Sequence, residues 1–263
     1  MSERRRAYLT PHPPILVPEV GRGRDAEIAS TARAMADLAD DLRRDPPETL
    51  VLMSPHAPII GRNVAVITAG RYRGSLAQFG APEVECSPAC DEELAAAISD
   101  HAGDEALLVE TGGVAPLDHG ALVPLSFLDR EGRFALVLMS IALSGMAAFE
   151  RLGAAIGKAA DATGRRIVFV GSGDLSHRLT PGAPAGYEPD ASRFDDQIVS
   201  IIRKGDLERL ADLDPELVEL AGECGLRSVY TAAGFLGPQP SVHEVLSYEC
   251  PFGVGYMTAR LGS

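Results

Sequence analysis

Two short stretches of the sequence place a histidine in the same proline-rich frame. Residues 10–14 read TPHPP and residues 54–58 read SPHAP, and each stretch follows an apolar run. Proline fixes its own φ and disfavours helical backbone in the residue before it, so we expect His12 and His56 on stiff, extended backbone. Metal sites need ligands that are held in place in advance. Either histidine alone would be read as a packing residue in a rigid turn, but the pair predicts two ligands of one metal ion.

Two further histidines also follow predicted strands. His177 comes after an apolar run and a Gly-Ser-Gly-Asp turn in IVFVGSGDLSHRL, and His119 lies in a turn in VAPLDHGALVPL. Open α/β sheets bind ligands beyond the carboxyl ends of their strands, so one pocket could collect four of the six histidines. His101 ends a predicted helix and His243 opens a predicted strand, and we expect structural roles for both.

A third metal ligand is expected near the C-terminus, in the stretch SYECPFGVGY. Glu249 ends an apolar strand, where an unpaired carboxylate would be costly. Its neighbour Cys250 points to the opposite face, because strand side chains alternate, so Glu249 is the preferred ligand. Two histidines and one carboxylate on one face of a metal are typical of non-haem Fe(II) oxygenases. Asp174 could orient the His177 ring, although an Asp in this turn is equally well explained as a turn former.

Short β-branched runs alternate with longer helical patterns along the chain. The predicted strands are Ala7–Thr10, Thr49–Ser54, Val64–Thr68, Ala106–Glu110, Phe134–Ile141, Ile167–Gly171, Val242–Glu249 and Val254–Leu261. The predicted helices are Asp25–Arg44, Asp91–Asp100, Gly145–Ala162, Ser192–Lys204 and Leu226–Leu236. This alternation predicts an α/β fold of three layers, α/β/α, around a mostly parallel or mixed sheet. The last two strands could form an antiparallel pair at one side of that sheet.

One long segment, 178–191, has three prolines, two glycines and no apolar period. We expect a loop there, either a lid over a binding site or a tolerated surface excursion. Arg178 and Tyr187 in this loop could meet a substrate, but surface positions are the simpler expectation for both.

The composition limits the class of protein. The chain has 263 residues, 46% hydrophobic residues and a formal net charge of −13, which suits one folded domain over residues 1–263. The charge argues against a nucleic-acid or anionic-membrane partner, and no apolar run is long enough for a membrane span or a secretory signal. Four cysteines fit a cytoplasmic protein without disulfides better than a disulfide scaffold. Cys86 and Cys90 lack a second pair with which to build a zinc knuckle.

Read in order, the stretches TPHPP, SPHAP, PLDHG, GSGDLSH and SYECPFGVGY carry a resemblance that spans nearly the whole chain. The chain resembles the class III extradiol ring-cleavage dioxygenases of the protocatechuate 4,5-dioxygenase catalytic-subunit type, and the related Memo-like proteins. The resemblance implies Fe(II) bound by His12, His56 and Glu249, with O₂ and a catechol-like aromatic as reactants. It also implies that His177 is the acid–base histidine and that His119 faces the substrate or oxygen.

Other functions remain open from the sequence. Zinc accepts the same ligand types as iron, and a zinc hydrolase could use the same three ligands with His177 as base. Memo-like relatives carry a cysteine among their metal ligands, which keeps Cys250 as an alternative to Glu249 and allows metal binding without ring cleavage. A homodimer is expected only from the habit of this class.

Overall fold

The computed structural model describes residues 5–238 and 242–262. Its centre is an eight-stranded sheet in the order β10-β11-β1-β9-β2-β8-β3-β6. The strands are β1 (Arg6–Thr10), β2 (Thr49–Met53), β3 (Val64–Thr68), β6 (Ala106–Glu110), β8 (Ala135–Met139), β9 (Ile167–Ser172), β10 (His243–Glu249) and β11 (Tyr256–Gly262).

The sheet is mixed, as expected. Strands β1, β9, β2 and β8 run parallel to one another, whereas β3 is antiparallel to β8 and β11 is antiparallel to β1. The predicted antiparallel pair of C-terminal strands is confirmed, and it forms one edge of the sheet. Along the strand direction, the carboxyl ends of β1, β9 and β2 therefore lie at one end of the sheet. Those of β3 and β6 lie at the opposite end.

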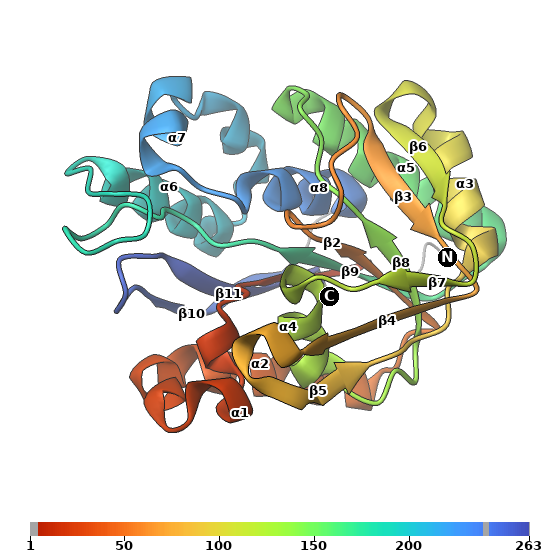
Figure 1. Cartoon of the computed structure of the whole chain (residues 1–263). Coiled ribbons are helices and arrows are strands. Elements are labelled where there is room, and N and C mark those ends of the chain that lie inside the picture. The colour runs from red at the N-terminus through yellow and green to blue at the C-terminus, as the bar shows by residue number, and fades with distance from the viewer. Residues whose placement is uncertain (1–4, 239–241, 263) are drawn as a thin grey trace.

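Each face of the sheet has its own apolar core, because side chains alternate along buried strands. Val51 and Met53 point to one core, and Leu50 and Leu52 point to the other. Helices α3 (Glu92–Ala102), α5 (Met146–Thr163), α6 (Ala191–Lys204), α7 (Pro215–Ala221) and α8 (Leu226–Leu236) cover the first face (Figure 1). Helices α2 (Ala29–Arg44) and α4 (His119–Leu128) cover the second face, beside the short α1 (Pro18–Gly21). The predicted three-layer α/β/α architecture is confirmed.

A small second sheet lies on the α2 and α4 side of the molecule (Figure 1). It consists of β5 (Ala81–Cys86), β4 (Arg71–Leu76) and β7 (Val114–Pro116), in that order. The sequence patterns did not predict these three strands, nor α1, α4 and α7. The 178–191 segment was predicted to be a loop, and residues 178–190 contain neither helix nor strand. None of the described helices is long and apolar enough to cross a membrane.

Candidate metal centre

Three neighbouring parallel strands deliver histidines to the same edge of the sheet. His12 follows β1, His56 follows β2, and His177 follows β9, which lies between them. His119 arrives by another route, because it is the first residue of α4 and follows β7 of the small sheet. The Asp118 side chain caps this helix by accepting a hydrogen bond from the Ala121 N–H, and this cap fixes the backbone beside His119.

The structure brings His12, His56 and His119 into one cluster. The Nε2 atoms of His12 and His56 are 3.1 Å apart, and the His56 and His119 ring centroids are 4.0 Å apart. One ring nitrogen from each histidine lies within 4.8 Å of the others. His12 is buried, His119 is half-buried and His56 is exposed, so the cluster opens to solvent on the His56 side.

A chain of hydrogen bonds determines which nitrogen of His12 is free. The Ser172 hydroxyl donates to the Gly120 carbonyl at 2.6 Å, so it must accept at its contact with His12 Nδ1, which is 3.0 Å long. His12 therefore carries its proton on Nδ1 and presents an unprotonated Nε2 to His56. Second partners of this kind fix the tautomer of metal-binding histidines.

His177 is held in the same tautomer by a different partner. Its Nδ1 donates to the Gly222 carbonyl at 2.5 Å, because a carbonyl oxygen can only accept. Its Nε2 is then unprotonated in the neutral ring and lies 3.9 Å from both Asp174 Oδ2 and Cys224 Sγ. Asp174 Oδ2 is also 3.9 Å from His12 Nε2, so Asp174 lies between the two histidines. His12, Asp174 and Cys224 form a second group whose ligand atoms all lie within 4.8 Å of one another.

Burial governs the charge states of the cluster. Burial, followed by the neighbouring His56, lowers the pKa of His12 to about 3, and the same two causes lower the pKa of His119 to about 4. Both rings are therefore neutral at pH 7 and offer lone pairs to a metal ion. Burial raises the pKa of Asp174 to about 6, against the opposing hydrogen bond from the His12 N–H. Burial also raises the pKa of the Cys224 thiol well above its usual value.

Asp174, His177 and Cys224 lie on two segments that several hydrogen bonds join. The His177 N–H and the Ser176 hydroxyl both donate to the Ala221 carbonyl, and the Cys224 N–H donates to the Asp174 carbonyl. Gly173 permits the close approach, because a Cβ there would lie 3.0 Å from the Gly225 nitrogen and closer still to its Cα. The 174–178 loop and the segment 220–224, which begins with the last two residues of α7, thus form one paired unit.

Glu249, the predicted third ligand, is not in either group of possible ligands that the described residues form. Its Oε1 accepts hydrogen bonds from the Thr31 N–H at 2.7 Å and the Thr31 hydroxyl at 2.6 Å. Thr31 lies in the first turn of α2, whose N-cap residue Ile28 offers no side-chain bond. The carboxylate is therefore paired, as its position required, but with the positive end of a helix. Cys250, the sequence alternative, is half-buried and is also in neither group.

The residues present fit a metal ion. Metal–nitrogen distances of about 2.0–2.1 Å place two ligands in neighbouring positions roughly 3 Å apart, which matches the separation of His12 and His56. The sequence predicts Asp174 only as a possible orienting residue and gives no indication of Cys224. Cys224 carries no local signal, because it lies in the turn Glu-Cys-Gly before α8 and reaches the site only through the paired loops.

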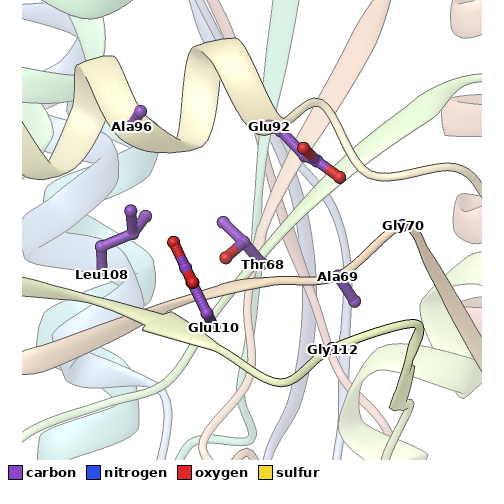
Figure 2. A pocket seen from close by; sticks show the side chains of 8 residues that line it. All are labelled: Thr68, Ala69, Gly70, Glu92, Ala96, Leu108, Glu110 and Gly112. Atoms are coloured by element: carbon purple, nitrogen blue, oxygen red, sulfur yellow. The ribbon is translucent and has the colours of Figure 1, made fainter.

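A separate hollow contains carboxylates but no imidazole or thiol. It has a volume of about 400 Å³ and lies at the carboxyl ends of β3 and β6, the opposite edge of the sheet from the histidines. Figure 2 shows Glu92 of α3 and Glu110 of β6 in its wall, with Thr68 between them. Its chemistry is unlike that of the histidine cluster, and it contributes nothing to the proposed metal centre.

The fold and part of the sequence are shared with other proteins. Over 97% of its length the chain is 34% identical to protein CA_C1420 of Clostridium acetobutylicum, of which it covers 56%. It thus spans about half the length of that relative. The crystal structure of the uncharacterized protein JW3007 from Escherichia coli K12 superposes with a TM-score of 0.69 at 15% identity, covering 98% of this chain and 99% of that one; at this identity the likeness concerns the fold alone.

The comparison with protein families gives a match over nearly the whole chain. Residues 6–259 match the family model described as the catalytic LigB subunit of aromatic ring-opening dioxygenase. The match includes all four histidines of the site, Asp174 and Cys224. The resemblance read from the ordered motifs is therefore confirmed, and the chain belongs to the family of catalytic subunits of aromatic ring-opening dioxygenases.

Proposed function

We propose that this protein is a non-haem Fe(II)-dependent extradiol dioxygenase-like enzyme that uses O₂ to open the ring of a catechol or a related aromatic. One observation carries the proposal: three histidines converge within 4.8 Å, in a chain of the ring-opening family. Residues 1–263 would form the single catalytic domain. The net charge of −13 favours a small-molecule substrate over a nucleic acid.

The proposed ligands differ in one residue from those expected from the sequence. His12 and His56 remain, and His119 replaces Glu249, because the His119 ring contacts both other rings. Neutral imidazoles suit both iron and zinc, so the donor set itself favours neither metal. Iron is proposed because O₂ chemistry requires a redox-active ion, and zinc is the alternative.

The protein residues around this site would manage protons. Bound Fe(II) would supply Lewis acidity toward the catechol oxygens and electrons toward O₂. His177 presents an unprotonated Nε2 and is the group that would accept a catechol proton and later return it. The Gly222 carbonyl keeps the ring aimed by holding Nδ1–H, and the Asp174 carboxylate, 3.9 Å from Nε2, would stabilise the protonated ring.

The test is anaerobic reconstitution with Fe(II), followed by oxygen uptake against a panel of catechols. We expect stoichiometric O₂ consumption and a ring-opened product that absorbs visible light. Zinc-loaded protein should consume no oxygen. The His177→Ala variant should keep its iron and lose turnover by about 10²–10⁴-fold, the usual contribution of a general acid–base. Tight iron binding without oxygen uptake on any catechol would contradict the proposal.

One observation favours a second candidate, a Memo-like metal-binding protein without ring cleavage. Cys224 Sγ, Asp174 and His12 also form a group of suitable size, so a thiolate could ligate the metal. The Cys224→Ser variant separates the two candidates. Lost metal with no wild-type oxygen uptake would favour the second, whereas retained iron and turnover would favour the dioxygenase.

A further inference from the structure

Helix α6 carries a carboxylate on its apolar, inward face. Asp195 is fully buried and lies between the buried residues Phe194 and Ile198 of the same helix. The charged groups that act on it most are Asp196 and His177, and no lysine or arginine is among them in the described part of the chain. A buried charge without a cation is expensive, and burial raises the pKa of Asp195 to about 6 despite two hydrogen bonds that favour the carboxylate. The free-energy cost of burying this carboxylate suggests that it has a structural or functional role.

Both oxygens of Asp195 accept a hydrogen bond, and one of the two donors is the residue before His177. Oδ1 accepts a hydrogen bond from the Ser176 N–H at 2.9 Å, and Oδ2 accepts one from the Tyr248 hydroxyl at 2.8 Å. Ser176 directly precedes His177. Asp195 therefore binds the backbone next to the proposed acid–base histidine, while Tyr248 anchors the carboxylate to β10.

The remaining polar groups of Ser176 are also bonded, so its backbone has little freedom. Its carbonyl accepts from the Gly255 N–H at 2.8 Å, and its hydroxyl donates to the Ala221 carbonyl at 2.9 Å. Gly255 presses against Asp195, because a Cβ at 255 would collide with Asp195 Oδ2. The Asp195 carboxylate of α6 is thus in close contact with Gly255, directly before β11, and is hydrogen-bonded to the Ser176 backbone and to Tyr248 of β10.

We propose that Asp195 is a positioning residue for His177, acting through the Ser176 amide, so that the His177 ring keeps its Nδ1–H on Gly222 and its Nε2 toward Asp174. This inference rests on the proposed function, because that function makes His177 the acid–base residue. The geometry it describes can be tested without turnover. The two hydrogen-bond partners of Asp195 are Ser176 and Tyr248, and neither is a proposed metal ligand.

Three variants of the full chain test this role. Asp195→Ala removes the acceptor for the Ser176 N–H. Asp195→Asn keeps an oxygen at the same position, so it should retain the hydrogen bond from the Ser176 N–H and behave as the wild type does. Ile202→Ala, on the same buried face of α6, is the control for a loss of packing without a loss of this hydrogen bond.

The primary measurement is NMR on the metal-free chain. In Asp195→Ala we expect amide exchange at Ser176 to rise at least tenfold, while amides of β2 stay unchanged. The ¹⁵N shifts of His177 should move from a single Nδ1–H tautomer toward a mixture. Asp195→Asn should restore both signals. Equal changes in Ile202→Ala, or an unchanged His177 tautomer in Asp195→Ala, would overturn the proposal.

Turnover supplies the second readout where the wild type is active. Asp195→Ala should lower kcat with KM and iron content unchanged, because the substrate and metal contacts remain. A rise in KM with unchanged kcat would overturn the positioning role. If the wild type shows no oxygen uptake, the proposed function fails, and the NMR comparison still decides the role of Asp195.

Discussion

At the scale of single residues, Glu249 could serve either as a helix cap or as a metal ligand, and a substitution distinguishes these two roles. Its carboxylate accepts two hydrogen bonds from Thr31 at the start of α2. We expect Glu249→Ala to lower the free energy of unfolding by about 1 kcal/mol, the usual cost of losing a cap, and to leave the metal stoichiometry at its wild-type value. Urea unfolding and elemental analysis measure the two effects. Lost metal in a folded variant would return Glu249 to the ligand set.

The buried carboxylate of Asp174 predicts a pH-dependent effect on the metal-free protein. Burial raises its pKa from 3.8 to about 6. Between these values the folded state binds more protons than the unfolded state, so this carboxylate costs stability as the pH rises from about 4 to 6, and the cost persists above 6. We expect Asp174→Asn to stabilise the metal-free chain at pH 7.5 by up to roughly 3 kcal/mol, the equivalent of the pKa shift.

Urea unfolding of both forms at pH 4 and pH 7.5 tests this expectation. The two forms should be nearly equal at pH 4, where the wild-type carboxyl is largely protonated in the folded state. Asparagine keeps an oxygen for the His12 N–H, so the hydrogen bond itself is retained. A variant less stable than the wild type at pH 7.5 would show that the carboxylate stabilises the metal-free fold.

Local sequence predicts where His12 and His56 lie in the fold better than it predicts which residues lie beside them, for a physical reason. His12 and His56 lie in proline-rich frames directly after strands, where local sequence controls the backbone. A carboxylate at the end of an apolar strand needs a partner, and Glu249 has one in Thr31, but the residues of a strand do not reveal which helix start will lie near it. Cys224 enters the site only because two distant loops pair, and no local pattern encodes such pairing.

At the scale of elements, the close approach of Gly173 to Gly225 allows the two segments that carry Asp174, His177 and Cys224 to pair. A methyl group at residue 173 would collide with Gly225. We expect Gly173→Ala to lower the free energy of unfolding by about 1–3 kcal/mol, as for other overpacked sites, and to weaken metal binding. Gly182→Ala is the matched control, because nothing lies within 4 Å of its added Cβ. Equal stability and metal affinity in the two variants would contradict the paired-loop description.

The elements that sequence patterns predicted are those with regular apolar spacing. The predicted bounds of Val64–Thr68, Ala106–Glu110 and Leu226–Leu236 agree with β3, β6 and α8. Helix α4 was missed because it is buried nearly all round and contains Pro124, so it lacks the polar face that produces a helical period. Strand β7 was missed because it is only three residues long.

At the scale of the whole molecule, a metal ion at this cluster should stabilise the folded chain. A ligand at 100 times its Kd adds about 2.7 kcal/mol when it binds only the folded state. We expect Fe(II) or Zn(II) to raise Tm by several degrees in the wild type and to have no effect in His12→Ala or His56→Ala. His101→Ala, on the exposed end of α3, should respond as the wild type does. A full Tm rise in both ligand variants would contradict the site.

The order of strands also determines when the site can form during synthesis. Strand β9 lies between β1, which His12 follows, and β2, which His56 follows. The two histidines can therefore be placed one strand apart only after residues 167–172 have been made. Strand β11, the last strand among the described residues, then pairs with the other side of β1. Contacts between such distant segments form late. During synthesis, His12 and His56 can therefore reach their final positions only after residues 167–172 have been made, and any metal ion that the cluster binds would enter after that point.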